Sequence, residues 1–212
     1  KTLMPQVAKL KESFGVERVV LVGDRGMISH KAIGELKDID GMAWITALKS
    51  TQIRGLVEAG ALQLGLFDER NLFEFSDPAY PGERLIACRN PELAKLRAHK
   101  RQALLAATTL ELEQIRERVA RGALQGAAAI GVKLGRVLDK YKVGKHFELI
   151  ITDTAVNYQV LEPQVAAEAA LDGIYVIRTG VPKKQMSAPD AVRGYKALTQ
   201  VERAFRSLKT VD

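Results

Sequence analysis

The apolar run VVLV within residues 17–23 constrains the fold more than any other feature of the chain. Consecutive branched apolar residues are typical of a strand covered on both faces, as in the parallel sheets of α/β proteins. Amphipathic helices are predicted over residues 2–15 and 29–37 on either side of this run, and a second apolar strand over 42–48. The alternation of helices and apolar strands predicts an α/β sheet.

The middle of the chain has a different pattern. Strands predicted over 71–76 and 84–87 enclose a turn that contains Pro and Gly, which indicates a β-hairpin. Helices predicted over 91–121 and 127–141 are joined by a short link that contains Gly, which favours an antiparallel helical hairpin. The remaining predicted elements are strands at 147–151, 158–160 and 174–177, a loop over 180–189 and a final helix over 190–209.

The composition is that of a globular chain with a basic balance. The 212 residues include 32 Lys and Arg against 25 Asp and Glu, and the net charge of +7 favours a polyanionic partner. The single cysteine, Cys88, excludes an internal disulfide framework and suits a reducing cytosol. Cys88 follows an apolar stretch, which predicts a buried strand thiol, and Trp44 is likewise predicted to lie in the core. No apolar stretch reaches the length of a membrane span.

The last predicted helix carries an acid among basic residues. Tyr195, Glu202 and Lys209 are spaced seven residues apart, so they lie near one face of a helix. A carboxylate on this face can hold a divalent cation, while the phenol and the amine reach DNA phosphates. A second acid, Asp24, ends the apolar strand of residues 17–23. An acid at a strand end and an acid on a late helix are two parts of a metal-ion phosphoryl-transfer site.

With these residues the chain resembles the DDE transposases of bacterial insertion sequences. One branch of that family carries Tyr, two residues, Arg, three residues, Glu, six residues and Lys, and Tyr195, Glu202 and Lys209 fall on this spacing. Leu198 stands where the family has Arg, so the DNA contact of that Arg is not expected here. The stretch GDRGM around Asp24 is similar to the surroundings of the family's second acid.

The resemblance implies a ribonuclease-H-like α/β core, present in part, with a large mixed α+β insertion between the second and third acids. Residues 1–59 would form the core portion with the second acid, residues 60–188 the insertion, and residues 189–212 the core helix with the third acid. It also implies Mg²⁺ or Mn²⁺ held by Asp24 and Glu202, DNA as the substrate and a homodimer of the full-length protein. A cytoplasmic, bacterial location at the nucleoid without membrane association is expected.

Several side chains near the two acids are predicted to contact DNA. The predicted contacts are Tyr195, Lys209, Arg25, Arg206, Lys183 and Lys184. A salt bridge is the competing interpretation for Arg25. Asp24 could instead cap a turn after the strand, and Glu202 could be a solvated acid on a charged helix.

The first of the three acids that the resemblance implies is not found at its expected place. Glu12 and Glu17 are the only acids that precede Asp24, and neither lies on a separate core strand. We therefore expect the chain to be a fragment whose first Asp lies upstream, without strand-cleaving activity on its own. Two alternatives stay open, a degenerate relative that binds DNA without cutting it and a helical-hairpin module, residues 91–141, that docks partner proteins.

Overall fold

The computed structural model describes residues 3–209, which fold into two compact units. The larger unit consists of Lys1–Arg89 together with Ile174–Asp212, and the smaller unit is Asn90–Gly173. Within the described range, the side chains that lie outside the description are those of residues 3, 4, 7, 8, 10, 202 and 205–209. Each unit has a hydrophobic core of its own.

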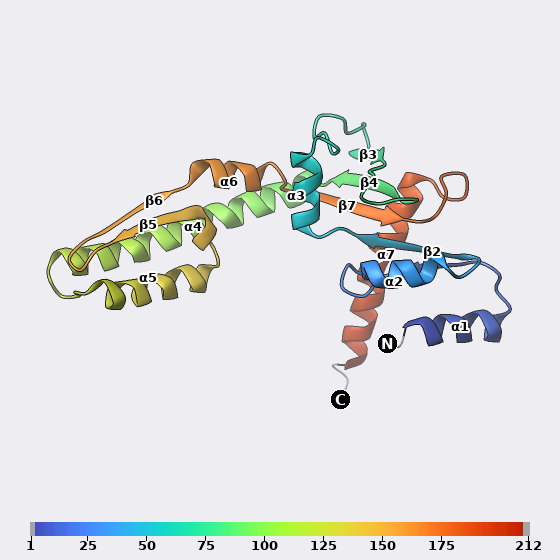
Figure 1. Ribbon diagram of the computed structural model, residues 1–212, viewed down its shortest axis with the longest axis horizontal. Coiled ribbons are helices and arrows are strands. Elements are labelled where there is room, and N and C mark those ends of the chain that lie inside the picture. The colour runs from blue at the N-terminus through green and yellow to red at the C-terminus, as the bar shows by residue number, and fades with distance from the viewer. Residues whose placement is uncertain (1–2, 210–212) are drawn as a thin grey trace. The chain divides into compact units, whose positions relative to one another are not determined.

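A mixed sheet forms the centre of the larger unit, with five strands within the described residues. Its strand order is β1-β2-β7-β4-β3 (Figure 1). β1 (Val19–Val22) and β2 (Met42–Ala47) are parallel, whereas β7 (Ile174–Thr179), β4 (Arg84–Arg89) and β3 (Leu72–Phe75) join by antiparallel pairing. The prediction of a mixed α/β fold is confirmed, as is the predicted hairpin of β3 and β4.

The helices of the larger unit are mostly those that the sequence predicts. α1 (Leu3–Phe14), α2 (His30–Lys37) and α7 (Ala188–Lys209) lie close to the predicted ranges. α3 (Ser50–Glu58) was not predicted, because its buried residues, Ile53 and Leu56, are too few to give a clear helical period.

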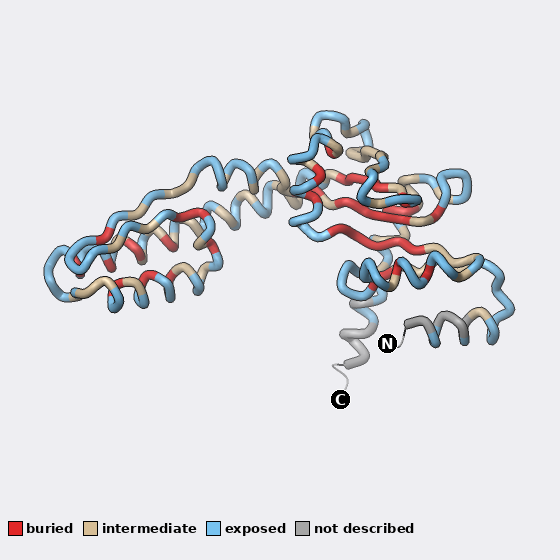
Figure 2. The backbone as a smooth tube through the Cα atoms, viewed as in Figure 1, coloured by how far each residue is buried: buried red, intermediate tan, exposed pale blue. Residues whose placement is uncertain are grey.

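The two faces of the sheet are covered by different helices, because successive side chains of a strand point to opposite faces. Trp44 of β2 packs with Ile33 and Leu36 of α2. Its neighbour Ile45 packs on the other face with Ala191 and the rest of a cluster that includes α7. Figure 2 shows that the buried residues of this unit follow the central strands. Trp44 is 3% exposed and Cys88 is 2% exposed, so both are core residues as predicted.

The prediction that β1 is covered on both faces is wrong. Val20 is 38% exposed and the other residues of β1 are half-buried. Among the described strands β1 pairs only with β2, so it is an edge strand of this sheet. An apolar run in a sequence shows only that the segment lacks polar residues. It does not distinguish an edge strand from a central strand.

A buried ion pair joins β7 to the turn before β4. Arg178 donates from Nε and Nη2 to the two carboxylate oxygens of Glu83 at 2.6 and 2.5 Å. Both side chains are at most 5% exposed, and the guanidinium lies 4.9 Å from the centre of the Tyr80 ring. Lys37 of α2 approaches the same carboxylate at 3.9 Å. The paired geometry satisfies charges that would otherwise be costly to bury.

The smaller unit is a helical hairpin with a two-stranded sheet packed on it. Its elements are α4 (Pro91–Ala120), α5 (Ala127–Tyr141), a short 3-10 turn (Gly144–His146), β5 (Phe147–Ile151), β6 (Val156–Val160) and α6 (Glu162–Ala169). Lys140 near the end of α5 lies 2.5 Å from Glu111 of α4, so the two helices are antiparallel, as predicted. α6 was not predicted from the sequence, and none of its residues is buried.

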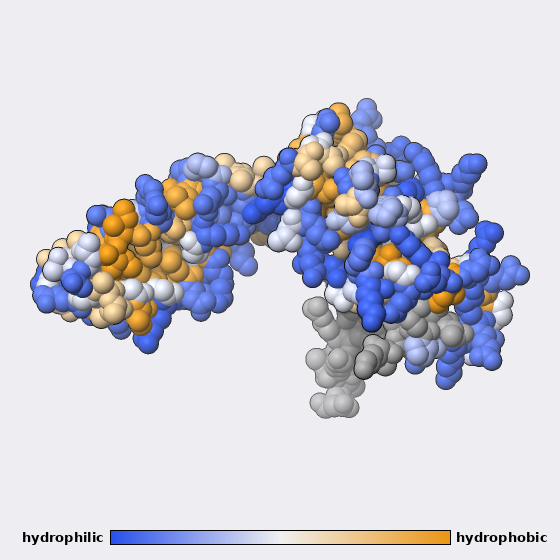
Figure 3. All heavy atoms as spheres, viewed as in Figure 1, coloured by the Kyte–Doolittle hydropathy of each residue, from blue (hydrophilic) through white to orange (hydrophobic). Residues whose placement is uncertain are grey.

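The core of the smaller unit lies between these helices and the β-hairpin. It contains Leu112, Ile115 and Val119 of α4 and further apolar residues of α5, β5 and β6. On the visible face of this unit, apolar side chains gather over its middle part (Figure 3). The hairpin turn is fixed to the start of α5, because Asp153 accepts hydrogen bonds from the N–H groups of Gly126 and Ala127 at 2.8 and 2.9 Å. Within residues 3–209, no helix has the length and apolar character needed to cross a membrane.

We predict that Glu83→Gln lowers the free energy of unfolding of the larger unit by about 3–5 kcal/mol, because Arg178 is left buried without a counter-charge. Urea unfolding followed by the fluorescence of Trp44, the single tryptophan, measures this effect in the larger unit. Glu35→Gln is the matched control, since Glu35 and Lys31 form an exposed pair at 4.0 Å that contributes less than about 1 kcal/mol. Equal losses in the two variants would contradict the prediction.

Candidate nucleic-acid and metal-binding site

Asp24 lies at the carboxyl end of β1, where the strand leaves its pairing with β2. The Gly23 N–H still donates to the carbonyl of Ile45 at 3.1 Å, and the chain then turns. Asp24 Oδ1 accepts hydrogen bonds from the N–H groups of Gly26 and Met27 at 3.0 and 2.7 Å. These contacts are those of a turn-capping carboxylate, the alternative role considered for this residue. Asp24 is exposed, and its Oδ2 accepts no hydrogen bond from the described residues.

The turn after β1 also places Arg25 on the surface. Arg25 is exposed and forms no ion pair with the described residues. Gly23 is needed for the close packing beside this turn, because a Cβ at that position would lie 2.8 Å from Cγ1 of the Ile28 side chain. The turn is therefore held by local contacts of Asp24 and Gly23, while Arg25 is left free to point to solvent.

α7 packs across the sheet of the larger unit. It contacts β1, β2, β3 and β7, and Ala191, Val192 and Tyr195 pack against the sheet core. Ser187 caps the helix by accepting a hydrogen bond from the Asp190 N–H at 3.3 Å. Hydrogen bonds from Ser187 and Arg193 lower the pKa of the Asp190 carboxyl.

The predicted site residues on α7 fall into two groups. Tyr195 is half-buried against the core, which is a packing role in addition to any contact with DNA. Glu202, Arg206 and Lys209 belong to the backbone of α7, and their side chains lie outside the described residues. The structure therefore brings Asp24 and α7 into the same compact unit, although 178 positions separate Asp24 from Glu202.

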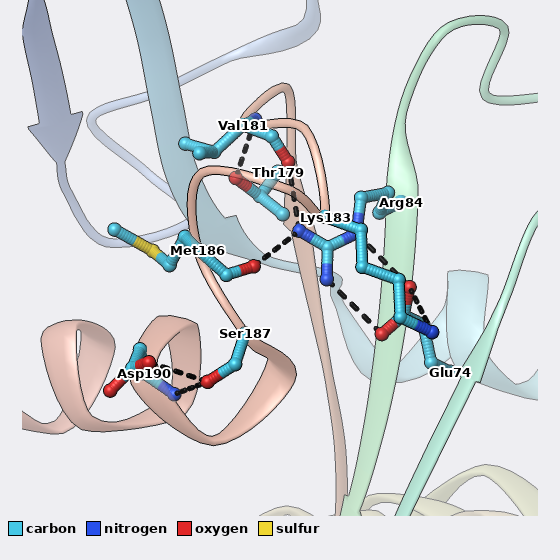
Figure 4. Close-up of polar contacts among 8 residues, drawn as sticks. All are labelled: Glu74, Arg84, Thr179, Val181, Lys183, Met186, Ser187 and Asp190. Carbon is cyan, nitrogen blue, oxygen red and sulfur yellow. Dashed lines mark hydrogen bonds and ion pairs between the residues drawn. The ribbon is translucent and has the colours of Figure 1, made fainter.

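The loop between β7 and α7 is fastened to the sheet by Arg84 of β4 (Figure 4). Its Nη1 donates to the carbonyls of Val181 and Met186 at 2.9 and 3.0 Å, and its Nε and Nη2 donate to Glu74 of β3 at 3.1 Å each. Thr179 accepts a hydrogen bond from the Val181 N–H at 3.1 Å. These contacts fix both ends of the loop, so the residues at its tip are displayed from a rigid base.

The two lysines predicted to contact DNA lie at the tip of this loop. The side chain of Lys183 is 76% exposed and its Nζ lies 3.8 Å from Glu74, a carboxylate that Arg84 already holds. Lys184 is exposed and forms no ion pair with the described residues. An exposed ion pair of this kind is weak, so Lys183 can exchange Glu74 for a phosphate at little cost.

The positive charge of the chain is concentrated in its last part. Residues 174–212 contain eight Lys and Arg against three Asp and Glu, whereas the chain as a whole has 32 against 25. Arg193, Lys196 and Arg203 of α7 are exposed, and their spacings of three and seven residues place them on one side of the helix. We use the name α7 basic surface for these three residues together with the exposed Lys183 and Lys184 of the preceding loop.

Asp24 is the one predicted metal ligand whose side chain belongs to the described residues. A hard cation such as Mg²⁺ prefers carboxylate oxygens, and Asp24 Oδ2 is an exposed oxygen of this kind. Within residues 3–209, no group of three His, Cys, Asp or Glu side chains has the arrangement of a metal centre, among those that the structure describes. The second predicted ligand, Glu202, lies outside the described side chains. Among the described side chains, that of Asp24 has the chemistry of a ligand for the predicted ion. A complete metal centre would also need Glu202 beside it.

Cys88 is not a candidate nucleophile. It lies in β4 within the core, and burial raises the pKa of its thiol to about 11. A buried thiol with this pKa stays protonated near neutral pH. The residue that sequence reasoning missed is Arg84, whose carbonyl partners are 97 and 102 positions away along the chain. No local pattern could indicate contacts at that separation.

Comparison of the chain with models of protein families, with curated proteins and with solved structures found no match in any of the three. The resemblance to DDE transposases therefore rests on the residues quoted above and stays a prediction.

We predict that Asp24→Ala lowers the free energy of unfolding by about 1 kcal/mol, because the N–H groups of Gly26 and Met27 lose their acceptor. Asp24→Asn keeps a side-chain oxygen at the same place, so its effect should be less than about 0.5 kcal/mol. Urea unfolding monitored by Trp44 fluorescence compares the two variants. If Asn is as destabilising as Ala, the charge of Asp24 and not its turn geometry stabilises this segment.

Proposed function

We propose that this chain is the catalytic-core part of a DNA transposase of the DDE type, which performs metal-dependent strand cleavage and strand transfer. The observation that carries the proposal is the placement of Asp24 and α7 in one compact unit. Asp24 ends β1, and α7, the helix of Glu202, contacts both β1 and β2. This is the relation expected of a strand-end acid and a helix acid in a ribonuclease-H-like core.

The β1–α2–β2 segment supports the ribonuclease-H-like assignment. β1 and β2 are parallel neighbours, and α2 connects them and covers one face of the sheet. Acids placed at the carboxyl end of such a strand pair face the same edge of the sheet. The proposed insertion over residues 60–188 covers β3, β4 and β7, which extend this sheet, together with the whole smaller unit.

The two acids have separate tasks in this proposal. Asp24 holds its own turn with Oδ1 and keeps Oδ2 for a divalent cation, so its carboxylate is oriented before the ion binds. Glu202 would approach from α7. The ion, Mg²⁺ or Mn²⁺, supplies charge stabilisation at the attacking and leaving oxygens of the phosphodiester.

The α7 basic surface gives the DNA a place to bind. Lys183 and Lys184 are displayed on a fixed loop, and Arg193 and Lys196 follow on the outer side of α7. Contacts of this kind position a nucleic acid through its backbone without reading its sequence. Arg25, next to Asp24, would add positive charge beside this carboxylate. DNA bound here would pass the end of β1 with its phosphates toward the protein.

A second candidate function is DNA binding without cleavage. Leu198, at the position of the family's Arg, is half-buried on α7, so it contributes packing where the resembled enzymes have a cation. A relative that lost its catalytic contacts could keep the α7 basic surface. Metal binding distinguishes the two functions, because the non-cleaving relative has no need of a cation at Asp24.

We predict that Asp24→Asn and Glu202→Gln each weaken Mn²⁺ binding by about tenfold or more, since each removes a charged oxygen ligand. Titration of free Mn²⁺ by electron paramagnetic resonance measures the affinity. The double variant should bind Mn²⁺ more weakly than either single variant, because both charged oxygen ligands are then absent. Asp77→Asn is the matched control, since Asp77 is another turn carboxylate of the same unit, accepting the Ala79 N–H at 2.9 Å. Wild-type affinity in both test variants would refute the site.

We predict that the chain binds duplex DNA with a strong salt dependence, and that Lys183→Ala/Lys184→Ala reduces the slope of log affinity against log salt by about 2. Fluorescence anisotropy of a labelled duplex at several salt concentrations gives the slope. Lys133→Ala/Arg136→Ala on α5 removes the same charge from the smaller unit and should leave the slope nearly unchanged. Equal changes in the two double variants would place the DNA elsewhere.

A further inference from the structure

The outer side of α5 is exposed to solvent. Its inner side carries three buried residues, which pack in the core of the smaller unit with residues of α4, β5 and β6. The residues on the opposite side recur at spacings of four and three, which places them on one face of the helix. In chain order they are Ala128, Val132, Gly135 and Asp139, and all four are exposed. We call the first three the α5 stripe.

The α5 stripe is apolar and has little side-chain relief. Val132 is 55% exposed. A Cβ added at Gly135 would meet no atom within 4 Å, and one added at Gly131, one turn earlier, would touch Cδ1 of Ile151 at 3.9 Å. The packing of the smaller unit therefore does not require glycine at either position, although glycine weakens a helix relative to alanine. The bare backbone at Gly135 instead allows a second chain to approach closely.

A band of basic side chains runs beside the α5 stripe, on the flank that faces α4. Lys133, Arg136 and Lys140 of α5 are exposed, and their spacings of three and four residues place them on one flank. Lys140 reaches Glu111 of α4 at 2.5 Å, so this flank is the one beside α4.

α4 adds one more basic residue to this band. Arg118 is exposed and lies on the same flank of α4 as Glu111, two turns later. Because α4 and α5 are antiparallel, Arg118 lies level with Lys133, which is two turns before Lys140 (Figure 1). We use the name hairpin basic band for Arg118, Lys133, Arg136 and Lys140.

Few acids oppose the charge of the hairpin basic band. Residues 118–142 contain six Lys and Arg and a single acid, Asp139. The two acids nearest the band are both engaged, because Asp139 pairs with Lys142 and Glu111 pairs with Lys140. The other three members of the band form no ion pair with the described residues, so their charge is available to a partner.

We propose that the α5 stripe and the hairpin basic band together bind an acidic amphipathic helix of a partner protein. The apolar side of that helix packs on the α5 stripe, and its carboxylates face the hairpin basic band. An apolar strip with a basic strip beside it complements the two sides of such a helix. The apolar contact supplies affinity, and the opposite charges set the orientation and speed the encounter.

The α5 stripe favours a protein over a nucleic acid as the occupant. Duplex DNA would offer phosphates to the hairpin basic band but no apolar side to Val132. Glu117, next to Arg118 in the chain, points about 100° away around α4 and so does not oppose the carboxylates of the partner helix.

Fluorescence anisotropy with two labelled peptides tests the proposal on the full chain. The first peptide, about five helical turns long, carries leucines on one stripe and glutamates beside it, and the second has lysine in place of each glutamate. We expect saturable binding of the acidic peptide only. Lys133→Glu/Arg136→Glu should raise its dissociation constant by about tenfold or more, since the attraction becomes repulsion. Lys95→Glu/Arg97→Glu, exposed in the first half of α4, is the control of equal charge and should leave binding nearly unchanged.

Gly135→Leu tests the close approach of the partner. It should weaken binding of the acidic peptide by about tenfold or more, because the new side chain stands where the partner helix packs. The same change should raise the melting temperature of the smaller unit, since leucine favours a helix more than glycine. Circular dichroism measures that rise and separates lost binding from lost folding. Gly34→Leu in α2 is the matched control, because an added Cβ there also meets no atom within 4 Å.

Four results would overturn the proposal. The acidic peptide fails to bind, or both peptides bind equally. Binding of the acidic peptide survives both Lys133→Glu/Arg136→Glu and Gly135→Leu. Lys133→Glu/Arg136→Glu loses more affinity for duplex DNA than its control does, which makes DNA the occupant. The chain self-associates and Gly135→Leu abolishes this in sedimentation equilibrium, which makes a second copy the occupant.

This inference does not rest on the proposed function. The variants of α5 leave Asp24, Glu202 and the α7 basic surface unchanged. Loss of peptide binding with normal Mn²⁺ and DNA binding therefore supports the interface independently. Loss of Mn²⁺ binding in Asp24→Asn, with peptide binding intact, concerns the proposed function alone.

Discussion

The larger unit depends on the pairing of β7 with two strands at once. β7 lies between β2 and β4 in the sheet, and it follows the whole of Asn90–Gly173 in the chain. Arg89 at the end of β4 is paired with Ile174 at the start of β7, so the chain leaves the sheet and returns to it at adjacent positions. Within the smaller unit, the Asn90 N–H donates to the Gly173 carbonyl at 2.9 Å and holds its two ends together. A self-contained smaller unit thus reduces the entropic cost of closing the sheet.

The placement of β7 explains how the rest of the larger unit is organised. Arg178 of β7 reaches the buried Glu83 before β4, and Thr179 donates to the Trp44 carbonyl of β2 at 2.6 Å. The loop after β7 is then held by Arg84, and α7 starts at a defined point and crosses the sheet toward β1. Two buried or half-buried arginines therefore set the direction of the helix that carries the third predicted acid.

Local patterns in the sequence predicted the elements better than their arrangement. The hairpin of β3 and β4 and the two helices of the smaller unit were predictable, because their partners are neighbours in the chain and their apolar periods are strong. The edge position of β1 was not predictable, since it depends on the other side of β2 pairing with β7, about 130 residues later in the chain than β2. At the candidate site, the turn at Asp24 involves Gly26 and Met27 and could be foreseen from GDRGM. The hydrogen bonds from Arg84 to the loop before α7 could not be foreseen from the sequence.

The proposed cation site at Asp24 belongs to the same compact unit as the basic residues of the last part of the chain, and this has a physical consequence for the proposed function. The net positive charge of residues 174–212 raises the electrostatic potential of this unit, so it disfavours a divalent cation there when DNA is absent. Phosphates bound on the same surface offset that potential, and the cation then gains both a neutral surrounding and phosphate oxygens as ligands. Binding of metal and DNA should therefore be cooperative, and by linkage each should raise the affinity of the other by the same factor. The positive charge in residues 174–212 should therefore make Mn²⁺ binding at the proposed site weaker in the chain alone than in its complex with DNA.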